Sequence, residues 1–114
     1  MFNFRESGAI MLERDITAQI MRYLKSLPLC FCWKQPGGMY GTAGLPDIIC
    51  CYHGMFAAFE VKTNTGRLSK LQEVTMKRIR EADGRAFKVT SVDEVKAALD
   101  SLEVLDENWM GVPR

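Results

Sequence analysis

Asp47, Glu60 and Lys62 stand out because they interrupt two apolar stretches of the chain. If His53 and Gly54 form a two-residue hairpin turn, the strand register continues until Asp47 lies opposite Glu60. Opposed residues share one face, with Cβ atoms ~4.5–5.5 Å apart, and Lys62 projects from the same face. Two carboxylates so close repel each other unless a cation lies between them, and carboxylate oxygens suit Mg²⁺ or Mn²⁺. A strand bulge would spoil this pairing, and a charged cluster on a solvated strand edge is the alternative.

Glu13 is a third candidate acid. It lies three residues before Ile16 and seven before Ile20, in the apolar stripe of a helix that the periodicity predicts. A carboxylate in such a stripe is costly unless something compensates its charge, which favours a functional role. The alternative is that the helix end frays, so that Glu13 reaches water or pairs with an arginine.

Gln72 has two possible roles. Ser69 and Gln72 have the spacing of a capping box, which begins a helix. Gln72 also shares a helix side with Met76 and Ile79, the side expected to face the sheet. The two roles remain open on the sequence alone.

Other chemistries find little support. The chain has one histidine, His53, and its place in a predicted turn disfavours catalysis that needs a histidine base. The glycine-rich segment 35–44 is not followed by the Gly-Lys-Ser/Thr sequence of a phosphate-binding loop. A zinc site is disfavoured because Cys50 and Cys51 are adjacent and would point to opposite faces of a strand. We expect all four cysteines to be small buried apolar residues.

The periodicity of apolar residues predicts an α/β fold with a mixed central sheet flanked by helices. The first three strands should form an antiparallel meander, and the final strand-helix-strand unit should be a parallel crossover. The tail over 106–114 is not assigned. The predicted elements are helices over 9–27, 69–83 and 91–105, strands over 29–34, 47–52, 55–62 and 86–91, and a turn over 64–68.

Length and composition are those of a globular domain. The chain has 114 residues, of which 47% are hydrophobic and 25% charged. These values exclude a disordered tail or a fibrous protein and predict a single domain over 1–114, with its core over about 9–105. No apolar run approaches the ~20 residues of a membrane span, and the first fifteen residues lack the apolar core of a signal peptide. We therefore expect a cytoplasmic protein without a membrane partner.

Short motifs resemble one nuclease family. Pro46-Asp47 followed by Glu60-Val61-Lys62 resembles the motif of the PD-(D/E)xK nucleases. The segments 44–49, 59–63 and 66–69, together with Gln72, are similar to the virus-type replication-repair nuclease (VRR-NUC) branch of that superfamily. The resemblance runs from Glu13 to about Leu99. It implies a restriction-endonuclease-like α-β-β-β-α-β core.

The resemblance also implies roles for individual residues. Mg²⁺ or Mn²⁺ would be held by Asp47, Glu60, the Val61 carbonyl and, directly or through water, Glu13. Lys62 would position or activate the attacking water, and Gln72 would match the polar residue that follows the catalytic strand. Because every motif position is retained, an active enzyme is expected.

Short stand-alone members of this family resemble Holliday-junction resolvases, act as homodimers and often occur in phages. The resemblance therefore implies a metal-dependent endonuclease that cuts branched DNA in bacterial or phage-infected cytoplasm. A flap or single-strand nuclease, a DNA-binding module that does not cut, an RNA-directed relative and a partner-binding protein are the alternatives. Four apolar residues are candidates for a dimer contact: Phe2, Phe4, Trp109 and Met110.

The net charge of +1 hides an uneven distribution. Residues 62–92 hold eight bases and three acids, whereas residues 93–114 hold two bases and six acids. A basic block that begins at the proposed catalytic lysine is consistent with binding to a phosphate backbone. A solvated helix face is the alternative for Lys77. The predicted DNA contacts are Arg67, Lys70, Lys34 and Lys77.

Overall fold

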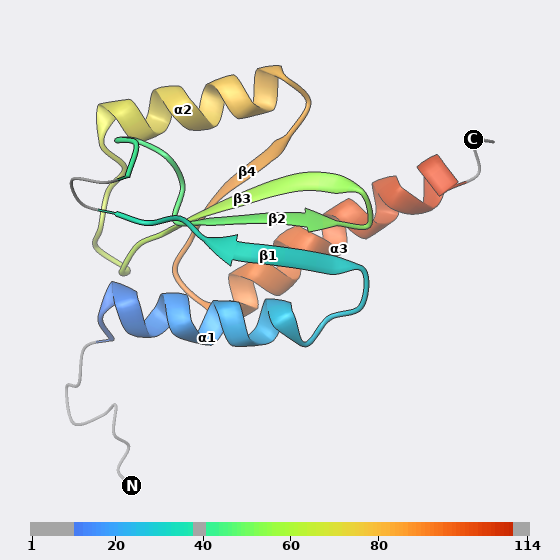
Figure 1. Ribbon diagram of the computed structural model, residues 1–114, viewed down its shortest axis with the longest axis horizontal. Helices are drawn as coiled ribbons and strands as arrows, with labels where there is room; N and C mark the ends of the chain where they lie inside the picture. The colour runs from blue at the N-terminus through green and yellow to red at the C-terminus, as the bar shows by residue number, and fades with distance from the viewer. Residues whose placement is uncertain (1–10, 38–40, 111–114) are drawn as a thin grey trace, which may run out of the picture.

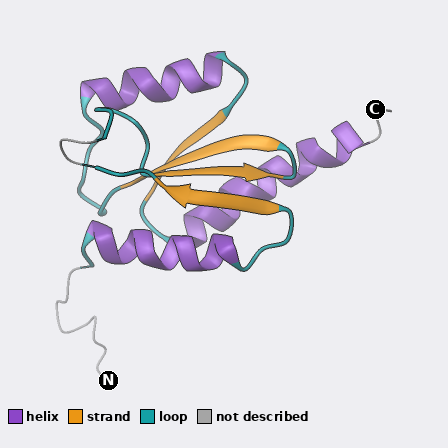
Figure 2. Ribbon diagram, viewed as in Figure 1, coloured by secondary structure: helices purple, strands orange, loops and turns teal. Residues whose placement is uncertain are grey.

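The fold is a four-stranded sheet between helices (Figures 1 and 2). The computed structural model describes residues 11–37 and 41–110, and side chains as far as residue 102. The elements in chain order are α1 (Glu13–Lys25), β1 (Cys30–Lys34), β2 (Ile48–Tyr52), β3 (Met55–Val61), α2 (Lys70–Glu81), β4 (Arg85–Val89) and α3 (Val92–Met110).

The sheet has the predicted topology and register. Its order is β1-β2-β3-β4, with the first two pairings antiparallel and the pairing of β3 with β4 parallel. Tyr52 pairs with Met55 and Ile48 with Phe59, as a two-residue turn requires. His53 and Gly54 both have positive φ, of 52° and 83°, which is typical of a type I′ hairpin turn. The predicted hairpin is therefore confirmed.

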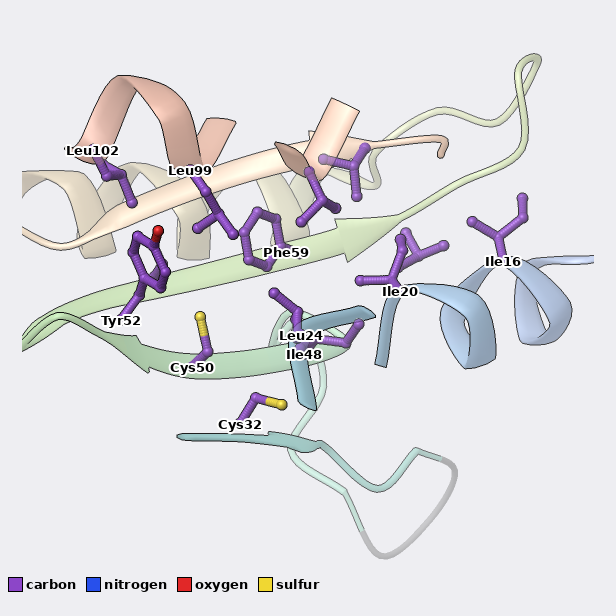
Figure 3. Packing of buried hydrophobic residues seen from close by; sticks show 14 residues of the cluster. Ile16, Ile20, Leu24, Cys32, Ile48, Cys50, Tyr52, Phe59, Leu99 and Leu102 are labelled. Atoms are coloured by element: carbon purple, nitrogen blue, oxygen red, sulfur yellow. The ribbon is translucent and has the colours of Figure 1, made fainter. Parts of the chain in front are cut away.

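The two faces of the sheet are covered differently. One face packs against α1 and α3 and forms the core, in which Phe59, Leu24 and Leu99 are among the fully buried residues (Figure 3). α2 lies on the opposite side of the sheet and packs against β4 (Figure 1). Strand alternation sends Ile48, Cys50 and Tyr52 to the α1–α3 face. Residues at the intervening positions, including Ile49, point to the other face of the sheet, on which α2 lies.

Several element ends differ from the prediction. Within the described residues, α1 begins at Glu13, later than predicted, and it ends at Lys25, ahead of Pro28. Leu29 has a φ of 52°, which breaks the extended backbone, so that β1 begins one residue later than predicted. α3 continues to Met110, past the expected end at 105, because no glycine or proline interrupts the sequence before Gly111.

Two further predictions concern side chains, those of the cysteines and those of the candidate dimer contacts. The prediction that all four cysteines are buried is wrong at two of them: Cys51 is exposed, on the sheet face that α2 only partly covers, and Cys30 is half-buried. The candidate dimer contacts Phe2, Phe4, Trp109 and Met110 lie outside the described side chains. In residues 11–37 and 41–110, no helix has the length and apolar character needed to span a membrane.

Candidate active site

Asp47 is held at the start of β2 by contacts on both sides. Pro46, which fixes the backbone before it, is fully buried. The Gln35 N–H donates to the Asp47 carbonyl at 2.7 Å, which continues the β1–β2 pairing past the strand end. The Val61 N–H donates to Asp47 Oδ2 at 2.8 Å. The carboxylate is therefore anchored against the end of β3.

The loop before Asp47 rests on α2. Gly44 has a φ of 84°, and a Cβ there would meet Leu71 Cγ at 2.5 Å and Thr75 Oγ1 at 3.2 Å. A glycine is needed at this point because it tolerates both the left-handed backbone and the close approach. This contact fixes the position of the loop that carries Asp47 relative to α2.

Glu60 is the buried acid of the site. Its side chain is 4% exposed, and Lys62 Nζ lies 3.5 Å from its Oε2. Gln72 Nε2 donates to the same oxygen at 3.0 Å. The other oxygen, Oε1, is buried and has no hydrogen-bond partner among the described residues. A buried carboxylate oxygen without a partner is costly, so this atom has capacity for a further ligand.

The environment of Glu60 disfavours its charged form. Burial and then the neighbouring Asp47 carboxylate raise the pKa of Glu60 from an ordinary 4.5 to about 7, while Lys62 opposes the shift. Desolvation and a second acid therefore outweigh one lysine. A cation placed between the two carboxylates would relieve both unfavourable effects.

Lys62 is fixed by the end of β4 and by the turn that follows β3. Its side chain is 14% exposed, and its backbone N–H donates to the Val89 carbonyl at 3.0 Å. A Cβ at Gly66 would lie 3.2 Å from Lys62 Cβ and 3.4 Å from Lys62 Cδ. The absence of a side chain at Gly66 thus leaves room for the aliphatic part of this lysine.

Gln72 fills both of the roles that the sequence left open. Its N–H donates to Ser69 Oγ at 3.1 Å, and its Oε1 accepts from the Ser69 N–H at 2.9 Å, which completes the capping box. The nitrogen of the same side-chain amide, Nε2, donates to Glu60 Oε2. One side chain therefore begins α2 and links the helix to the acid.

Glu13 does not share this arrangement. It is exposed as the first residue of α1, so its predicted place in the buried stripe is wrong. The stripe of Ile16, Ile20 and Leu24 runs out at the helix end, where Glu13 reaches solvent. Within the described part of the chain, no group of three or more His, Cys, Asp or Glu side chains is arranged to hold a metal. The assignment of Glu13 as a metal ligand stays a prediction.

Two carboxylates suffice for the metal that the motif implies. Mg²⁺ is commonly bound by one or two carboxylates, with water and substrate phosphate as the other ligands. Asp47 and Glu60 supply such a pair, and the unpartnered Oε1 of Glu60 is a candidate ligand atom. The Val61 carbonyl belongs to the residue whose N–H already binds Asp47. The donor set therefore fits Mg²⁺ or Mn²⁺.

The predicted DNA contacts are spread around the site. Arg67 lies in the turn after Lys62, and Lys70 is the first residue of α2; both are exposed. Lys34 is exposed at the end of β1, where it pairs with Ile48, and strand alternation directs its side chain to the α1–α3 face, opposite the acids. Lys77 lies farther along α2, and its Nζ is 3.9 Å from Glu81 Oε2 on an exposed helix face. This ion pair matches the solvated-face alternative for Lys77.

Comparison with solved structures gives the fold a name. One structure, a "VRR_NUC domain", matches with a TM-score of 0.64 and 20% identity over 77% of this chain and 94% of that one. A "VRR_NUC domain protein" matches with a TM-score of 0.65 and 16% identity over 81% and 88%. The chain has the VRR-NUC fold. Neither protein-family models nor curated proteins gave a match.

The VRR-NUC fold agrees with the restriction-endonuclease-like core expected from the motifs. The structure also contains contacts near the site that the sequence did not predict. Gly44 approaches Leu71, which is distant in the chain, and Gly66 approaches Lys62 through the conformation of the turn between them. Residue spacing specifies neither distance. Trp33 was also missed, although its i, i+2 spacing from Phe31 is a signal that both rings share one strand face.

Proposed function

We propose that this protein is a metal-dependent endonuclease that hydrolyses phosphodiester bonds in branched DNA. The observation that carries the proposal is the convergence of Asp47, Glu60, Lys62 and Gln72 at one end of the sheet, with Glu60 Oε1 buried and unpartnered. The VRR-NUC fold of the chain supports the nuclease part of this proposal. Mg²⁺ or Mn²⁺ is the proposed cofactor.

The chain's own residues have separable tasks in this reaction. Asp47 and Glu60, with the Val61 carbonyl, would hold the metal, which when bound polarises the phosphate and neutralises developing charge. Lys62 lies where its ammonium can orient a water or stabilise negative charge beside the acids. Gln72 holds the Glu60 carboxylate in position through its Nε2. Glu13 is proposed as an outer acid that contacts the metal through water.

The proposed substrate is a four-way junction, cut by a homodimer. Resolution of such a junction needs two symmetric cuts, which a two-fold dimer with two sites supplies. Arg67 and Lys70 are exposed, five and eight residues after Lys62 in the chain, and such side chains suit contacts with phosphates. A flap or splayed-arm substrate is the second candidate, which the exposed and adjacent rings of Phe31 and Trp33 favour.

A cleavage panel tests the proposal. Junction, flap, nicked and linear duplex DNA are incubated with Mg²⁺, Mn²⁺ or EDTA, and the solution mass is measured alongside. We expect cleavage of branched DNA that depends on the metal and is lost in Asp47→Ala and Lys62→Ala, while both variants still fold. Cleavage by folded Asp47→Ala at the wild-type rate would refute the active site. A monomer that cuts only flaps would refute the resolvase assignment alone.

A further inference from the structure

The sheet face that carries the proposed site continues into an aromatic surface. Strand pairing arranges this face in rows, and Gln35 lies beside Asp47 in the row nearest the acids. The next row contains Trp33 paired with Ile49, and the one after it contains Phe31 paired with Cys51. Alternation along β1 places both rings on the face of Asp47 and Glu60. The rings therefore extend away from the site along the edge strand.

These aromatic side chains are open to solvent. Phe31 is 71% exposed and Trp33 is 41% exposed, because α2 packs over β4 at the other edge of the sheet (Figure 1). Their ring centroids are 5.7 Å apart, with an angle of 50° between the planes. Neither ring belongs to the buried core cluster. Two adjacent large rings on an uncovered sheet face form an exposed apolar patch of the kind that ligands contact.

Trp33 is also connected to the active site. Its Nε1 donates to Gln35 Oε1 at 2.5 Å, and the Gln35 N–H donates to the Asp47 carbonyl at 2.7 Å. Two residues along a strand span about 6.6 Å, so the Trp33 backbone is about that far from the row of Asp47. This separation is comparable to the length of one nucleotide in an extended strand.

We propose that Trp33 and Phe31 form a platform on which unpaired bases next to the scissile phosphate stack. This inference rests on the proposed nuclease function and names its substrate class, DNA with unpaired nucleotides at the point of cutting. Aromatic side chains on open sheets bind single strands in this manner, because every base offers a π-face. Lys70, exposed at the start of α2 on the same side of the sheet, supplies a positive charge for the accompanying backbone.

A second copy of the chain fits the same face less well. Phe31, Trp33 and Phe56 together expose about 300 Å² at 150–250 Å² per aromatic side chain, given their exposed fractions of 71%, 41% and 46%. A standard interface buries roughly 800 Å² on each partner. The aromatic surface supplies less than half of that area, whereas two stacked bases need no more than two rings.

Binding in EDTA tests the platform separately from cleavage. The probes are a duplex with a five-nucleotide single-stranded overhang, the same duplex with abasic overhang residues, and a blunt duplex. We expect Trp33→Ala to weaken binding of the base-containing overhang by about 5- to 150-fold. Binding of the abasic and blunt duplexes should change by less than twofold. Val74→Ala, which truncates a 50%-exposed apolar residue on α2, is the matched control and should leave all three affinities unchanged.

A spectroscopic measurement gives a second readout. The chain has two tryptophans, so Trp109→Phe leaves Trp33 as the only one. Stacking predicts that the base-containing overhang quenches Trp33 emission and that the abasic overhang does not. Flap, splayed-arm and four-way junction DNA in the same assay then distinguish free ends from opened branch points.

Three results would overturn the platform. The first is an unchanged affinity of Trp33→Ala for the overhang. The second is an equal loss of affinity for the abasic or blunt duplex. The third is a halved solution mass in Trp33→Ala, which would make the face a dimer contact. The binding assay contains EDTA, so its result does not depend on cleavage. Failure to cleave DNA in Mg²⁺ would refute the nuclease proposal and leave the binding results unaffected.

Discussion

Replacing Glu60 with glutamine should stabilise the metal-free protein at alkaline pH, although Glu60 belongs to the proposed catalytic site. Its pKa rises from 4.5 to about 7 on folding, because of burial and the nearby Asp47 carboxylate. Between these two pH values the folded protein holds a proton that the unfolded chain has released. Stability must therefore fall as the pH rises through this interval.

The size of the effect follows from the two pKa values. One pKa unit corresponds to about 1.4 kcal/mol, and part of the loss has already occurred at pH 5. The free energy of unfolding of the wild type should thus fall by about 2 to 3 kcal/mol between pH 5 and pH 8 because of this group alone. Glutamine cannot ionise, so Glu60→Gln should lack this contribution while its side-chain oxygen can still accept from Gln72.

Urea unfolding at pH 5 and pH 8 in EDTA measures the difference. The stability gap between Glu60→Gln and the wild type should widen by about 2 to 3 kcal/mol in favour of the variant as the pH rises. Glu81→Gln is the control, because Glu81 is 63% exposed and its removal should alter the gap by less than about 0.5 kcal/mol. At pH 8, Mg²⁺ should stabilise the wild type but not Glu60→Gln. A gap independent of pH would refute the conclusion that Lys62 and Gln72 compensate the buried charge of Glu60 only in part.

Three further predictions concern the surroundings of the acids. Gln72→Ala should lower the free energy of unfolding by about 1 kcal/mol and should also lower the cleavage rate. Ser69→Ala should lower only the stability, because it removes the cap but keeps the amide that donates to Glu60. Equal cleavage rates of the two variants would contradict this. Gly66→Ala should reduce the cleavage rate with less than about 1 kcal/mol of destabilisation, since its Cβ would press on the catalytic lysine, and unchanged single-turnover kinetics would argue against that contact. The double variant Arg67→Ala, Lys70→Ala should flatten the salt dependence of DNA binding by about one in slope per residue; an unaltered slope in a salt titration would exclude these side chains as phosphate contacts.

The sequence predicted the hairpin and its acids because local geometry determines both. A two-residue turn at His53 and Gly54 leaves one possible register, and the alternation of side chains then places Asp47 and Glu60 on one face. The structure adds that Asp47 also binds the Val61 N–H. That contact depends on side-chain direction at a strand end, which spacing alone does not specify.

Other features depended on neighbours that are distant in the chain. Glu13 has the helical spacing of a buried residue but is exposed, because it is the first residue of α1 and the buried stripe begins only at Ile16. Cys51 was expected to be buried because the strand is apolar, yet α2 covers only the β4 side of its face. The dual role of Gln72 required both the cap and the position of Glu60. Such outcomes are set by packing between elements and not by the local pattern.

Single-turnover cleavage of four-way junction and flap DNA by Asp47→Asn tests the central claim most directly. Asparagine keeps an oxygen that can accept from the Val61 N–H but removes the charge that would hold Mg²⁺. With the fold verified by its unfolding transition, the rate on both substrates should fall at least about a hundredfold relative to the wild type. A folded Asp47→Asn protein that cuts as fast as the wild type in Mg²⁺ would contradict the assignment of this cluster as a nuclease active site.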